Sequence, residues 1–104
     1  MSKLQVVATI PAQPEAVEAI REVMRTLAEA TRAEEGSLSY VVFESAAAAG
    51  TFVTLERWRG QPDLDAHLAS AHVAAAFAAA DGKLSGDVAI HPLVPVAHAR
   101  QLRH

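Results

Sequence analysis

The chain has 104 residues, of which 51% are apolar and 20% are charged, and its formal net charge at pH 7 is -3. This length and composition predict a single folded domain over residues 1–104. The charges are scattered and form no basic patch, so we do not expect nucleic acid as a partner. The absence of cysteine excludes disulfides, thiolate catalysis and thiolate-bound zinc or iron–sulfur clusters.

Two features indicate the cellular compartment. Residues 1–7 lack the apolar segment and cleavage site of a secretory signal, and no apolar run approaches membrane-spanning length. A chain without cysteine also fits a reducing compartment. We therefore expect a cytoplasmic protein that has no membrane partner.

The first part of the chain predicts a strand, a long helix and a second strand. Residues 4–10 are rich in β-branched side chains and are followed by a proline, which is typical of a short strand. A helix is expected from Pro14, because apolar residues then recur at spacings of three and four as far as Thr31. Gly36 is expected to stop this helix, and residues 37–44 form the next strand.

A hairpin and a second helix are expected to follow. Residues 51–58 have the pattern of a third strand, and the small residues at 45–50 suit a hairpin loop. The second helix is expected to begin near Pro62 or Asp63. Its inner face carries His67 among apolar side chains.

The last third of the chain predicts a bend, another helical segment and a final strand. Ser70 is a candidate cap for a helical segment that ends at Gly82, and we expect a bend between this segment and the preceding helix. The final strand is expected within residues 86–94. Residues from about 96 to 104 have the character of a C-terminal tail.

The order of these elements predicts an α+β fold. A β-α-β-β-α-β order is that of the ferredoxin-like fold, with the helices on one face of an antiparallel sheet. In strands 37–44 and 51–58 both faces carry apolar residues, and neither face is consistently polar. We therefore expect the sheet face without helices to be covered by another layer of protein. A second copy of the chain is the simplest cover. We therefore expect a homodimer in which two sheets pack together as a dimeric α+β barrel.

Three short motifs follow one another through the middle of the chain. They are E-G-x-x-x-Y, F-x-x-x-E-x-W and a helical histidine about nine residues later, here Glu35, Gly36, Tyr40, Phe52, Glu56, Trp58 and His67. In order and spacing they resemble the antibiotic biosynthesis monooxygenase family, which often has a further histidine where His72 stands. The resemblance covers most of the chain, and it also implies the dimeric α+β barrel.

His67 and Glu56 are the candidate catalytic residues. An imidazole on the inner face of a helix can take a proton from a phenolic substrate near neutral pH, which makes His67 a candidate base. The alternative is a hydrogen-bonded histidine of the core. Glu56 is a carboxylate in an apolar strand and is either a second base, a group that orients His67 or a water, or a structural bridge to a neighbouring arginine or backbone amide.

Three further residues are candidates for substrate binding. Trp58 offers a flat wall for an aromatic substrate, although tryptophan at a strand end also packs in cores and interfaces. Tyr40 can donate a hydrogen bond to a substrate oxygen if the strand register points it inward. His72 follows His67 by five residues, so in an unbroken helix the two would point apart by roughly 140°. Only a bend would bring both into one pocket; otherwise His72 caps a helix or contacts the partner.

No cofactor is expected. The spacing of His67 and His72 matches neither H-x-x-x-H nor a non-haem iron triad, so we expect no metal. The haem-degrading branch of the resembling family has tryptophan where His67 stands and histidine where this chain has Phe77, which argues against haem. The five glycines are isolated, so there is no loop for a flavin or nucleotide phosphate.

The resemblance implies a specific chemistry. Family members similar to this chain oxygenate electron-rich phenols, anthrones or quinols without metal or flavin, so the implied partners are a small aromatic substrate and molecular oxygen. In this hypothesis His67 is the base, Glu56 orients it or a water, and Trp58 and Tyr40 bound the pocket. Two alternatives remain open. One is an isomerase of a small carbonyl or lactone compound, and the other is a non-catalytic small-molecule-binding module of a stress response.

Overall fold

The computed structural model of the chain describes residues 3–97, so most of the predicted C-terminal tail lies outside the described residues. The elements, in chain order, are β1 (Leu4–Pro11), the short 3-10 helix η1 (Pro14–Ala16), α1 (Val17–Arg32), β2 (Ser37–Glu44), β3 (Thr51–Trp58), α2 (Gln61–Leu68), α3 (Ala71–Ala80) and β4 (Ala89–Pro92). The predicted order is confirmed, and so is the bend that divides the second helical region.

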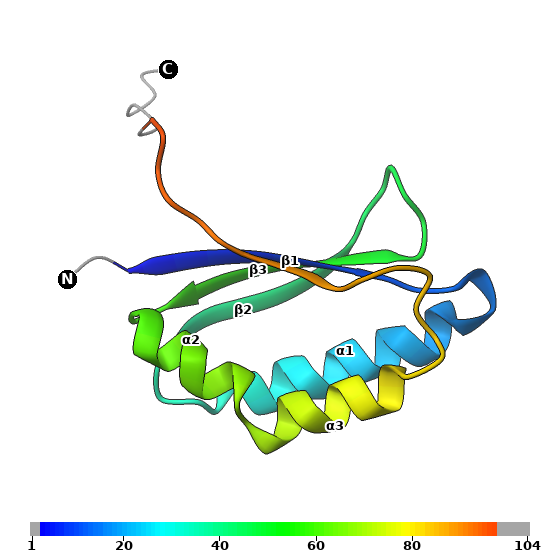
Figure 1. Cartoon of the computed structure of the whole chain (residues 1–104), viewed down its shortest axis with the longest axis horizontal. Coiled ribbons are helices and arrows are strands. Elements are labelled where there is room, and N and C mark those ends of the chain that lie inside the picture. The colour runs from blue at the N-terminus through cyan, green and yellow to red at the C-terminus, as the bar shows by residue number, and fades with distance from the viewer. Residues whose placement is uncertain (1–2, 98–104) are drawn as a thin grey trace.

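The strands form one antiparallel sheet in the order β2-β3-β1-β4. The helices α1, α2 and α3 all lie on one side of this sheet, and no described helix lies on the other side (Figure 1). This arrangement is the predicted ferredoxin-like α+β fold. The core therefore lies in the layer between the helices and the sheet.

Helix α1 packs one face against the sheet because Ile20, Met24 and Leu27 recur at helical spacing and are buried there. The prediction that Gly36 stops this helix is wrong. α1 ends at Arg32, and its cap Ala33 keeps a right-handed conformation. Gly36 is instead required by packing, since a Cβ atom at this position would overlap the side chain of Asp63 at the start of α2.

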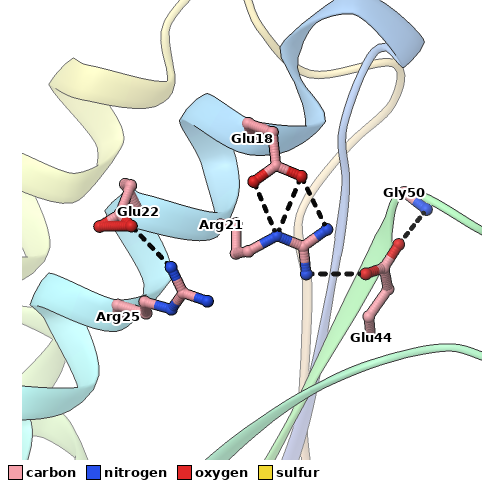
Figure 2. Close-up of polar contacts among 6 residues, drawn as sticks. All are labelled: Glu18, Arg21, Glu22, Arg25, Glu44 and Gly50. Atoms are coloured by element: carbon pink, nitrogen blue, oxygen red, sulfur yellow. Dashed lines mark hydrogen bonds and ion pairs between the residues drawn. The ribbon is translucent and has the colours of Figure 1, made fainter.

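The hairpin between β2 and β3 is joined to α1 by side chains (Figure 2). Nη1 of Arg21 donates to Oε1 of Glu44 over 2.8 Å, and the backbone N–H of Gly50 donates to Oε2 of Glu44 over 3.0 Å. Gly50 has a φ of 84°, a left-handed conformation that suits glycine at the end of the loop. The Gly50 amide and then the Arg21 guanidinium lower the pKa of Glu44. Arg21 also pairs with Glu18 within α1.

The sheet face without helices is apolar over much of its area. Val41 and Phe43 on β2 and Leu55 on β3 are 42%, 49% and 47% exposed, and Val41 lies directly opposite Leu55. Val7 of β1 continues this row, because it pairs with Leu55 on the other side of β3. The single chain therefore leaves a contiguous apolar surface uncovered.

In the described part of the chain, none of the helices combines the length and the apolar character that crossing a membrane requires.

Candidate active site

A cavity of about 70 Å³ lies in the layer between the sheet and the helices α1 and α3. Its walls are apolar apart from the side chains of Tyr40, Thr54, Glu56 and His67. Leu68 and Phe77 also line it and are themselves exposed, so they form part of its rim. An apolar lining with a few convergent polar groups is typical of a small-molecule site, but the volume of this cavity in the single chain is below the roughly 300–1,000 Å³ of most ligand pockets.

His67 is held in this cavity by helix α2. The helix starts after Gly60 with Pro62 in its first turn, and it buries Leu64 and His67, which are three residues apart and so share one face. The imidazole is only 4% exposed. Its ring centroid lies 4.7 Å from that of Trp58 and 5.7 Å from that of Tyr40, so two aromatic rings fix its position.

Glu34, which the sequence analysis did not identify, is the hydrogen-bond partner of His67. It lies in the turn after α1, and its Oε2 is 2.7 Å from Nδ1 of His67. Its side chain is 17% exposed, whereas that of the neighbouring Glu35 is 89% exposed. The available signal was an acidic pair directly after an amphipathic helix, but the sequence does not tell which of the two acids turns inward.

The bend after α2 brings His72 to the same carboxylate. The hydroxyl of Ser70 caps α3 by accepting from the Val73 amide, as predicted, and it also donates to the carbonyl oxygen of His67. As a result Nε2 of His72 lies 2.6 Å from Oε2 of Glu34. His72 does not line the cavity, however. It contributes to a separate groove between α1 and α3 on the outside of the helices.

This arrangement determines which nitrogen of His67 is free. An ionised carboxylate oxygen only accepts hydrogen bonds, so the two imidazoles must donate to Glu34 through Nδ1–H of His67 and Nε2–H of His72. A neutral His67 then carries its lone pair on Nε2. Glu34 and His67 thus have the geometry of a general base whose imidazole is oriented by a carboxylate.

His67 and Tyr40 both line the cavity, and neither Nε2 of His67 nor the hydroxyl of Tyr40 forms a hydrogen bond with a described residue. Among the described residues, Thr31 Oγ1 is the only side-chain polar atom that is fully enclosed and lacks a hydrogen-bond partner. His67 Nε2 and the Tyr40 hydroxyl also lack a hydrogen-bond partner but are not fully enclosed in this way. Part of the surface of each of these two atoms is therefore accessible. Burial, and then the negative charges of Glu56 and Glu34, raise the pKa of Tyr40, so its hydroxyl remains a donor at neutral pH.

Glu56 lines the cavity, but its carboxylate forms hydrogen bonds with residues other than His67. Its Oε2 accepts from the Thr54 hydroxyl over 2.6 Å, and its Oε1 accepts from Nε1 of Trp58 over 2.9 Å. Trp58 is completely buried and does not line the cavity. In the structure, therefore, Glu56 fixes the indole, and the indole packs against His67.

The chain matches the family described as antibiotic biosynthesis monooxygenase over residues 4–79. It belongs to this family. It is similar to "Putative monooxygenase Rv0793" of Mycobacterium tuberculosis, with 35% identity over 98 residues that cover 94% of this chain and 96% of that protein. It is also similar to "Putative monooxygenase YcnE" of Bacillus subtilis, with 35% identity over 65 residues, 62% of this chain and 68% of that protein.

A solved structure of a family relative supports the fold. The structure of the Mycobacterium tuberculosis protein matches this chain with a TM-score of 0.84 at 34% sequence identity, over 95% of this chain and 100% of that chain. The family resemblance stated from the motifs is therefore confirmed, together with the ferredoxin-like fold that the order of the elements predicted.

The motif residues of this family member divide into two groups in space. Tyr40 and Glu56 are direct neighbours across β2 and β3, and both line the cavity with His67. Glu35 points outward, and its carboxylate lies 3.6 Å from Nη1 of Arg59. The first motif thus marks the turn that carries the inward-facing Glu34, one residue before its own acid.

Proposed function

We propose that this protein is a cofactor-independent monooxygenase that acts on a small aromatic substrate of the quinol or anthrone type and uses molecular oxygen. The supporting observation is the hydrogen bond from His67 Nδ1 to Glu34, which leaves Nε2 as a base in an apolar cavity. The names of the family relatives point to the same class of reaction.

The first step is removal of an acidic proton from the substrate. His67 Nε2 takes this proton, and the imidazolium that forms is stabilised by the ionised Glu34 on its other nitrogen. In this proposal the Tyr40 hydroxyl donates a hydrogen bond to the substrate oxygen on which the negative charge develops. Glu34 is therefore a positioning residue in this proposal, and it takes the role that the sequence analysis assigned to Glu56.

The substrate anion then supplies all the electrons that oxygen needs. In an anthrone, for example, a ring methylene becomes a carbonyl that carries one oxygen atom, and the other oxygen atom leaves as water. The apolar cavity contributes by excluding bulk water from the anion and from the reactive intermediates. Trp58 acts from behind His67 by holding the ring against movement.

The test is oxygen uptake by the metal-free protein with a panel of quinols and anthrones. We expect uptake that His67→Ala removes and that Asp65→Ala retains, because Asp65 lies on the exposed side of the same helix. Absence of uptake with every substrate would contradict the proposal. A rearranged product formed without oxygen uptake would indicate an isomerase, and a ligand recovered unchanged would indicate a binding module.

We also propose that two copies of the chain pack through the uncovered sheet face around Val41, Phe43 and Leu55. Phe43→Asp should convert the dimer into a monomer, as measured by analytical ultracentrifugation. Ala78→Asp introduces the same charge on the exposed side of α3 and should leave the mass unchanged. A wild-type protein that is monomeric at micromolar concentration would contradict this proposal.

A further inference from the structure

Three potential metal ligands converge beside the cavity. The ligand atoms of Glu34, His67 and His72 all lie within 4.8 Å of one another. They come from three different segments, namely the turn after α1, the last turn of α2 and the first turn of α3. We propose that these groups bind a divalent transition metal ion of the zinc class.

The donor set favours this class of ion. Two imidazole nitrogens with one carboxylate oxygen suit zinc, copper or nickel, whereas calcium and magnesium prefer oxygen ligands alone. Three protein ligands also leave a coordination position for water. The sequence-based expectation of no metal rested on the spacing of His67 and His72 and on the absence of thiolates, and it did not include Glu34 or the effect of the bend.

The ligands need to move little to reach a metal-bound geometry. The separations from Glu34 Oε2 to His67 Nδ1 and His72 Nε2, 2.7 Å and 2.6 Å, are those of hydrogen bonds. Metal–ligand bonds of about 2.0–2.2 Å in a tetrahedron place neighbouring ligand atoms roughly 3.3–3.6 Å apart. The two imidazole nitrogens lie up to 4.8 Å apart, so they must also approach each other by up to roughly 1.5 Å. Movements of about 1 Å by all three ligand atoms would therefore replace the two shared protons by one metal ion.

Protons and the metal ion compete for this site. Both imidazoles must release the proton that they donate to Glu34, or move it to their other nitrogen, before they can bind a metal. Metal binding should therefore release protons from the site. When His67 binds the ion through Nδ1, its remaining proton lies on Nε2, so the nitrogen that faces the cavity can no longer accept a proton.

The experiment uses the full-length chain after removal of metals with a chelator. Cobalt(II) is titrated with visible absorption as the readout, and zinc(II) with calorimetry. The chain contains five histidines, so the reference is the variant His91→Ala/His98→Ala/His104→Ala, which keeps only the two histidines of the proposed site. We expect this reference to bind one equivalent of metal.

Removal of single ligands should weaken binding in that background. We expect His72→Ala and Glu34→Gln to reduce affinity by tenfold or more, since even loss of a second-shell partner costs about 10–100-fold. Circular dichroism shows whether each variant keeps its fold. Equal affinity in these variants and in the reference, or loss of binding in the reference itself, would overturn the proposal.

The binding measurement is independent of the proposed oxygenase activity. Cobalt binding without oxygen uptake from any substrate would contradict the proposed function alone, and oxygen uptake without cobalt binding would contradict the metal site alone. If both proposals hold, zinc should inhibit oxygen uptake, and His72→Ala should weaken that inhibition by tenfold or more.

Discussion

Two of the carboxylates that join separate elements in residues 3–97 differ in their partners. At the surface, Glu44 at the end of β2 pairs with Arg21 of α1 (Figure 2). Beside the cavity, Glu34 pairs with two histidines. An arginine stays charged at every ordinary pH, whereas an imidazole gains and loses a proton near neutrality. The Glu44 carboxylate can therefore only stabilise the fold. The Glu34 carboxylate has partners that can also take part in the proposed proton transfer and metal binding.

The largest expected effect is a difference in oxygen uptake between a variant at the cavity and a variant at the surface pair. His67→Ala removes the proposed base, and we expect oxygen uptake to fall by about 10²–10⁴-fold, the usual contribution of general base catalysis. Arg21→Ala breaks the surface network and should change turnover by less than about twofold, because Arg21 does not line the cavity. Comparable losses in the two variants would mean that His67 acts through the fold alone.

Glu34→Gln should have a smaller effect, because it keeps the shape of the side chain but removes its charge. We expect kcat to fall by roughly 10–100-fold with little change in KM, since the imidazolium loses its counter-charge while the base remains. Glu35→Gln is the matched control, because Glu35 points into solvent. A loss confined to KM would argue for a role in substrate binding instead.

Tyr40→Phe removes a donor and keeps the aromatic ring beside His67. We expect kcat to fall by about tenfold. The wild-type pH profile should show no step from Tyr40 near its ordinary value of 10.0, because burial and the nearby carboxylates raise its pKa further. A step near pH 10 that is absent from Tyr40→Phe would show that the hydroxyl is less enclosed than in this structure.

The smallest effect is expected at the surface pair. The pKa of Glu44 is lowered in the folded chain, so its carboxylate stabilises the fold above its unfolded-state pKa, and this stabilisation is lost as the pH falls through the folded value. Glu44→Gln should therefore reduce Tm by a few degrees at most at pH 7, less in high salt and not at all in strong acid. Thermal melts across this pH range measure the difference.

The sequence predicted the elements well because their signals are local. The periodicity of 51–58 and the capping chemistry of Ser70 predict a strand and a bend from a few neighbouring residues. The inward position of Tyr40 was left open, because it depends on register, and β2 shifts its register between Ser37 and Ser39.

The site was harder to predict than the fold, because it depends on contacts between distant segments. Glu34 is separated from His67 by 33 positions, and only the docking of α2 against the turn after α1 brings them together. Gly36 shows the same limit. Its local reading as a helix stop was wrong, because the requirement comes from Asp63, which lies in the following helix.

The packing of Trp58 against His67 gives the protein an optical property. Trp58 is the only tryptophan of the chain, and its ring lies 4.7 Å from that of His67. Fluorescence of the native protein therefore arises from one indole whose immediate neighbour is the proposed base. Protonation of that imidazole, arrival of an aromatic ligand or binding of a quenching ion such as copper should each change the emission, so the state of the site can be followed without a label.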